Sequence, residues 1–178
     1  LFEDCIDEPS GLAMMSLYRK DSKGLSAQAL ERFDTLVYDI QDVGCRYYTF
    51  ISTLRNAMGD CAKAGKRLVV LDRPNPLGGR VEGTTLLPDY RSFVGCWEMP
   101  QRYGLTCGEF ARMVNAEEQI GCDLHVVPCQ GLTREMLFSD WGRICSICLI
   151  AMALVITAVG LFVGGGDLFE VFLPSIAM

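Results

Sequence analysis

Histidine is almost absent from this sequence: its 178 residues include one, His125. A metal site built from several histidines is therefore excluded. A basic excess is also lacking, since the formal net charge is −6, and we expect no nucleic-acid partner. The glycine-rich dinucleotide fingerprint, the Walker A motif and the G-x-S-x-G elbow are missing too. These absences argue against nucleotide-binding proteins and serine hydrolases, and we expect neither a metal nor another cofactor.

Cysteine, by contrast, is abundant, with nine residues. Because this number is odd, at least one thiol stays free or pairs between chains. Cys122 and Cys129 lie on one predicted strand, roughly 23 Å apart at ~3.3 Å per residue, which is too far for a disulfide between them. The spacing therefore does not indicate a disulfide framework, and the cysteines do not decide the compartment.

The chain divides by composition into a mixed region, residues 1–141, and an apolar tail, residues 142–178. Residues 144–166 carry no charge and are long enough for a transmembrane helix, at ~1.5 Å per residue against a hydrocarbon core of roughly 30 Å. We therefore expect membrane contact through 144–166 and a single-pass protein, with a buried core helix as the alternative. A frame shift or mis-joined exon is a second explanation for the tail. Because the chain opens at Leu1, we expect a fragment or a processed chain.

The periodicity of residues 1–141 predicts strands that alternate with helices. A strand, a helix and a strand within about 35 residues predict a right-handed βαβ unit with parallel strands. We therefore expect an α/β fold of the doubly wound kind: a mostly parallel sheet with flanking helices. The predicted strands are Leu12–Tyr18, Leu36–Ile40 (buried on both faces), Leu68–Leu71 and Asp123–Val127; the predicted helices are Ser26–Phe33 with Ser26 as N-cap, Tyr47–Ala64 ended by Gly65, and Phe110–Glu118 after a capping box at 106–109.

Polar clusters follow two of the predicted strands. The first runs from Asp39 to Tyr47 and the second from Asp72 to Glu82. Because a βαβ crossover brings both strand ends to the same sheet edge, carboxylates, guanidinium groups, an amide and a phenol should meet in one crevice. A purely structural alternative is that Asp39 and Asp42 cap the next helix while Asp72 pairs with an arginine.

Three stretches carry a family resemblance: VYDIQDVGCRYYTFISTL, VVLDRPNPLGGRVEG and SFVGCWEMPQRYGLTCGEFARMVN. In this order and spacing they resemble the NamZ-like exo-β-N-acetylmuramidase family, glycoside hydrolase family 171, formerly a domain of unknown function. The resemblance covers about residues 11–141. It implies a Rossmann-like α/β domain, truncated here at both ends, and release of terminal N-acetylmuramic acid from peptidoglycan fragments. The partner would be a muramic-acid-containing saccharide, and the family is mostly extracytoplasmic or secreted.

The resemblance also assigns candidate site residues. Glycosidases generally need two carboxyl groups, one as acid and one as base or nucleophile. The candidate catalytic residues are Asp42, Asp72 and Glu82, and the candidate substrate-binding residues are Asp39, Gln41, Arg46, Tyr47, Arg73, Asn75, Tyr103 and Glu109.

Three departures from the family pattern bear on activity. The family's upstream Pro-Glu-His-Gly segment, whose Glu is the leading candidate for the general acid, is missing here. Tyr103 stands where the family usually has His, and after Trp141 the apolar tail replaces a polar segment and a C-terminal domain. The sequence therefore leaves two hypotheses: a glycoside hydrolase, or a non-catalytic, membrane-tethered sugar-binding remnant that lacks the general-acid Glu.

Overall fold

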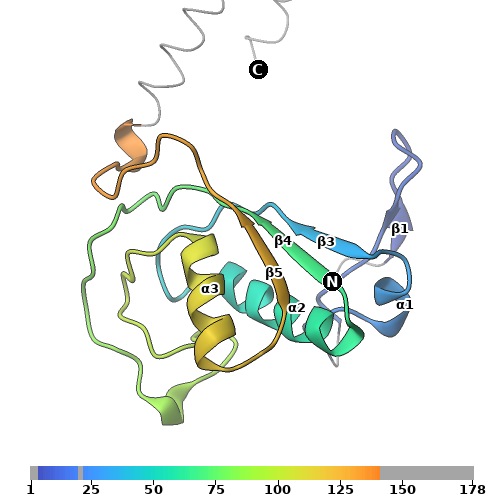
Figure 1. Ribbon diagram of the computed structural model, residues 1–178, viewed down its shortest axis with the longest axis horizontal. Helices are drawn as coiled ribbons and strands as arrows, with labels where there is room; N and C mark the ends of the chain where they lie inside the picture. Colours follow the sequence, from blue (N-terminus) through green and yellow to red (C-terminus); the bar gives the residue numbers. More distant parts are fainter. Residues whose placement is uncertain (1–3, 20–21, 141–178) are drawn as a thin grey trace, which may run out of the picture. The chain divides into compact units, whose positions relative to one another are not determined.

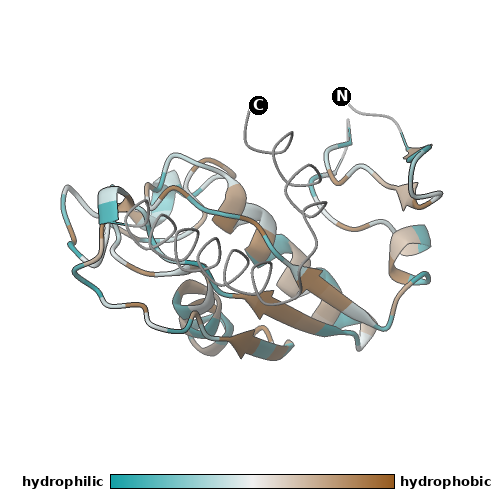
Figure 2. Ribbon diagram, turned by 90° about the horizontal axis from the view of Figure 1, so that it is seen from above, coloured by the Kyte–Doolittle hydropathy of each residue, from teal (hydrophilic) through white to brown (hydrophobic). Residues whose placement is uncertain are grey.

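The computed structural model describes residues 4–19 and 22–140. A three-stranded parallel sheet in the order β3-β4-β5 lies at its centre, made of β3 (Thr35–Tyr38), β4 (Arg67–Leu71) and β5 (Asp123–Val127) (Figure 1). The strands are rich in β-branched and large apolar residues, which favour the pleated conformation (Figure 2). The parallel pairing predicted for the βαβ unit is thus confirmed.

Two helices, α2 (Phe50–Ala64) and α3 (Cys107–Glu117), pack on one face of this sheet and on each other. That face carries Leu68 and Val70, both fully buried. Each such side chain contributes about 1.5–3 kcal/mol when removed from water, so this layer is the main source of stability. Other residues of this core with almost no exposed surface are Ile51, Leu54, Met58, Cys61, Phe110, Ala111 and Val114.

The ends of the helices follow local signals in the sequence. Gly65 ends α2 in the left-handed conformation at φ +64°. The short helix α1 (Ala27–Leu30) begins after Ser26, whose side chain accepts a hydrogen bond from the Ala29 amide. Both predictions are confirmed, although α2 begins three residues later than predicted and α1 ends three residues earlier.

The doubly wound arrangement is not seen in residues 4–19 and 22–140, because α2 and α3 share one face of the sheet. The prediction that strand 36–40 is buried on both faces is wrong: β3 is an edge strand ending at Tyr38, and Val37 is 55% exposed. The predicted strand Leu12–Tyr18 is confirmed only at β2 (Ala13–Met14), which pairs antiparallel with β1 (Cys5–Ile6). Apolar side chains of this segment, such as Leu12 with 68% of its surface exposed, are not buried against a sheet.

The predicted apolar helix and membrane contact at 144–166 lie outside the described residues, as does the tail 142–178. Among the helices that are described, none has the length and apolar character needed to cross a bilayer. A long irregular segment connects β4 to α3 and includes a single 3₁₀ turn, η1 (Pro88–Tyr90).

Candidate functional site

The loop that follows β3 carries the first predicted cluster. Asp39 is exposed and forms a salt bridge of 2.6 Å with Arg73, which follows β4. The Gln41 side-chain amide donates to the backbone oxygens of Asp42, at 2.7 Å, and of Pro74, at 2.9 Å. The structure therefore brings the loops after β3 and β4 together at one edge of the sheet, as the crossover predicted.

Asp42 is a buried carboxylate, with 5% of its surface exposed. Its Oδ2 accepts hydrogen bonds from the Gly44 amide, at 2.8 Å, and from the Tyr103 hydroxyl. Its Oδ1 is buried without a hydrogen-bond partner among the described residues. Tyr103 is itself 4% exposed, so in this structure it braces Asp42 and lies too deep to meet a substrate directly.

Asp72 binds the beginning of α3. One carboxylate oxygen accepts from the Thr106 hydroxyl at 2.7 Å, and the other accepts from the Gly108 amide at 2.8 Å. A carboxylate is favoured there because the first amides of a helix lack partners and carry a partial positive charge. Asp72 thus ties the end of β4 to the N-terminus of α3. The neighbouring Asn75 is 8% exposed and likewise bonds backbone groups, at Leu105 and Leu77.

Buried groups between the two loops have raised pKa values. Burial raises the pKa of the Cys107 thiol to about 12, with further contributions from the charges of Asp42 and Asp72. Burial also raises the pKa of the Tyr103 phenol, and the adjacent Asp42 charge acts in the same direction. These groups are neutral at physiological pH, so Cys107 is a packing residue at the start of α3 and is not activated as a nucleophile.

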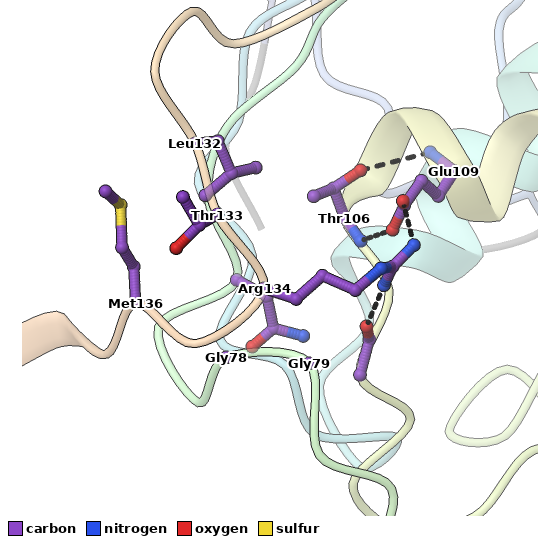
Figure 3. Close-up of a pocket in the computed structure, with 10 residues that line it drawn as sticks. Gly78, Gly79, Thr106, Glu109, Leu132, Thr133, Arg134 and Met136 are labelled. Carbon is purple, nitrogen blue, oxygen red and sulfur yellow. Dashed lines mark hydrogen bonds and ion pairs between the residues drawn. The ribbon is translucent and has the colours of Figure 1, made fainter.

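A narrow pocket lies beside the N-terminus of α3 (Figure 3). The predicted capping box is present: the Thr106 hydroxyl accepts from the Glu109 amide at 3.1 Å, and Glu109 Oε2 accepts from the Thr106 amide at 3.0 Å. The second oxygen of Glu109 is paired with Arg134, whose side chain reaches it from the segment after β5. The pocket holds about 30 Å³, which admits one or two water molecules but no sugar ring.

Three other predicted residues lie around this edge in different settings. Glu82 is 58% exposed and forms a salt bridge of 2.8 Å with Arg102. Arg46 is 7% exposed and donates to the backbone oxygens of Thr84, at 2.9 Å, and of Met99. Tyr47 is 52% exposed. Arg46 therefore holds loops in place, whereas Glu82 and Tyr47 are accessible to a ligand.

Sequence reasoning missed Arg134 and the reason for the Gly78-Gly79 pair. A Cβ on Gly79 would lie 2.9 Å from the Cβ of Arg134, and the Gly79 amide donates to the Arg134 oxygen at 2.7 Å. The two glycines therefore admit the segment around Arg134. In the sequence, the glycine pair was the feature that could have indicated a close approach of another segment, whereas an isolated arginine 25 residues beyond Glu109 indicated nothing.

No group of three or more His, Cys, Asp or Glu side chains suited to a metal occurs in the described stretch of the chain.

Fold and site together define an α/β protein whose polar loops converge on one helix N-terminus at the carboxyl edge of a parallel sheet. The family model for the N-terminal region of exo-β-N-acetylmuramidase NamZ matches residues 1–145. The chain belongs to this family.

Curated and solved relatives give the same picture. Peptidoglycan β-N-acetylmuramidase NamZ of Bacillus subtilis (strain 168) is 45% identical over 136 residues, which are 76% of this chain and 33% of that protein. Two crystal structures of DUF1343 family proteins from Bacteroides fragilis NCTC 9343 are also similar. One has a TM-score of 0.73 at 45% identity, covering 77% of this chain and 36% of that one. The other has a TM-score of 0.68 at 38% identity, covering 74% and 37%. The chain thus spans about a third of the length of these relatives.

Proposed function

We propose that this chain forms one wall of the active site of a Rossmann-like glycoside hydrolase that releases terminal N-acetylmuramic acid from peptidoglycan fragments. The observation that carries the proposal is the convergence of the loops after β3 and β4 on the N-terminus of α3, through Asp42 and Asp72. The similarity to a peptidoglycan β-N-acetylmuramidase supplies the reaction and the substrate class. The small volume of the pocket fits a site that is completed by other segments of a longer protein.

The contacts suggest how the predicted catalytic residues divide their work. Asp42 and Asp72 are engaged by donors of their own chain, so we assign them to holding the loops. Glu82 is exposed and paired with a single arginine on the surface, so it is the predicted catalytic carboxylate best placed to exchange a proton with a substrate. Asp39 and Arg73 are both exposed, so we assign Asp39 to sugar hydroxyls and Arg73 to the carboxylate of muramic acid.

A chromogenic glycoside of N-acetylmuramic acid tests the proposal with the longer protein whose other segments we propose complete the site. We expect turnover that Glu82→Gln lowers by at least about 100-fold, as is typical for loss of a general acid or base. The matched control is Glu98→Gln, which breaks another Arg–Glu pair, with Arg91, at 2.5 Å. Calorimetric binding of muramyl fragments without turnover would support the sugar-binding alternative. If the protein neither binds muramyl fragments nor turns over the glycoside, the hydrolase proposal and the sugar-binding alternative are both wrong.

A further inference from the structure

The guanidinium group of Arg102 supports the exposed carboxylate of Glu82. Its Nη1 donates to Glu82 Oε2 at 2.8 Å, and its Nη2 donates to the backbone oxygen of Leu77. One arginine thus binds both ends of the loop 77–82. The Arg102 side chain is 20% exposed, whereas that of Glu82 is 58% exposed. The guanidinium is therefore mostly enclosed by protein, while the carboxylate that it holds faces solvent.

The backbones of the two residues are paired as well. The Glu82 amide donates to the Arg102 oxygen and the Arg102 amide donates to the Glu82 oxygen, each at 3.0 Å. On its other side, Arg102 forms a backbone bridge with Cys45 of the loop after β3. The Arg46 amide donates to the Gln101 oxygen beside this bridge, at 2.9 Å. Arg102 therefore lies between the loop after β3 and Glu82, and it fixes the position of Glu82 relative to that loop.

The pair formed by Arg102 and Glu82 differs from two other arginine–glutamate pairs of the chain. In those pairs the arginine donates to both carboxylate oxygens, which is the geometry that a planar guanidinium favours. They are Arg91–Glu98, at 2.9 and 2.5 Å, and Arg55–Glu118, at 2.9 and 2.6 Å. Arg102 occupies only one oxygen of Glu82, and the other, Oε1, accepts no hydrogen bond from any residue that the structure describes. The carboxylate is thus held at one oxygen and available at the other.

We propose that Arg102 is a positioning residue for Glu82: it holds Oε2 and the backbone of Glu82 so that Oε1 meets the substrate in one orientation. This role rests on the proposed function, in which Glu82 exchanges a proton with the substrate. A glutamate side chain without such a partner samples several rotamers, and misplacing a reacting group by about 1 Å costs about 100-fold in rate. Arg102 acts only through Glu82 and does not touch the reacting atoms.

Turnover of the chromogenic N-acetylmuramic acid glycoside by the longer protein tests this role. We expect Arg102→Gln to lower kcat by about 10–100-fold and to change KM by less than about threefold, because the reacting oxygen is misplaced while substrate binding is kept. Arg102→Lys should restore part of kcat, because it keeps a positive charge beside Glu82 but loses the planar fork that also binds Leu77. The matched control is Arg91→Gln, which breaks the pair with Glu98 and should leave both constants unchanged.

The double substitution Glu82→Gln/Arg102→Gln separates positioning from general damage to the loop. If Arg102 acts through Glu82, the double variant has the same kcat as Glu82→Gln alone. Urea midpoints show which variants are folded, and Arg102→Lys replaces Arg102→Gln in this comparison if the latter is unfolded. Equal factors of loss with and without Glu82, or a change in KM alone, would overturn the positioning role and leave the proposed function standing. A kcat that Glu82→Gln does not lower, or no turnover by the unsubstituted protein, would overturn the proposed role of Glu82 and the role of Arg102 together.

Discussion

Replacing Gly44 by alanine tests whether the two site loops touch as described. Gly44 has φ +75°, and a Cβ added there would lie 2.0 Å from the side-chain oxygen of Asn75. Asn75 cannot move freely, because its side chain is held by the Leu105 oxygen and the Leu77 amide, each at 2.9 Å. Gly65 is the matched control, since it has φ +64° and an added Cβ would have no neighbour within 4 Å.

Both substitutions place an alanine in a left-handed conformation, but only Gly44→Ala also creates a steric clash. A left-handed conformation costs an alanine about 1–2 kcal/mol, which is the whole effect expected for Gly65→Ala. Gly44→Ala adds overpacking against Asn75, for which core insertions give about 1–3 kcal/mol. We therefore expect Gly44→Ala to lower the free energy of unfolding by about 2–5 kcal/mol.

Urea denaturation measures these free energies from the midpoint, provided that the slope is unchanged. The double substitution Gly44→Ala/Asn75→Ala removes the clash, so its cost should be smaller than the sum of the single costs by about 1–3 kcal/mol. Equal costs for Gly44→Ala and Gly65→Ala, or strict additivity in the double variant, would refute the described contact between the loops.

Two further predictions concern the buried and polar groups of the core. Asp72→Ala should lower the free energy of unfolding by about 2–3 kcal/mol, because charged hydrogen bonds from Thr106 and Gly108 are lost. The control Asp123→Ala breaks an exposed ion pair with Arg67 and should cost less than about 1 kcal/mol. Equal urea midpoints for the two variants would contradict this prediction. Burial raises the pKa of the Cys61 thiol from 9.0 to about 11 and that of Cys107 to about 12. As pH rises, the unfolded chain therefore releases these thiol protons at a lower pH than the folded chain does. The contribution of these thiols to the free energy of unfolding is complete below about pH 9 and falls as pH rises toward 11–12. A free energy of unfolding that stays constant from pH 8 to pH 11 would refute this prediction.

The elements that the sequence predicted well are those with a local physical signal. Gly65 ended α2 where a left-handed residue was expected, and Thr106 with Glu109 formed the capping box that starts α3. The strand at 68–71 was recognisable because Leu68 and Val70 belong to a short apolar run. In each case a few adjacent residues carry the information.

The burial of β3 could not be predicted in the same way. A run such as LVYDI is the same in sequence whether its strand is central or at an edge, because burial depends on which strands lie beside it. The structure puts Leu36 and Tyr38 toward the helices and leaves Val37 on the uncovered face. The doubly wound arrangement is absent from the described residues because the strand order β3-β4-β5 follows the chain, so both connecting helices lie on the same face.

The structure shows which groups the polar residues of the site contact, and the sequence alone did not. Asp42, Asp72 and Asn75 all bind groups of their own chain, so their side chains hold the loops in place before any ligand arrives. Pre-organisation of this kind needs residues of fixed type at fixed spacing, and this is why the motifs are recognisable. Glu82 lies in the second of the recognised stretches, but its carboxylate is 58% exposed and pairs with Arg102 alone. For the proposed reaction the recognisable residues build the edge, and the groups that meet the sugar must be sought among the exposed ones beside them.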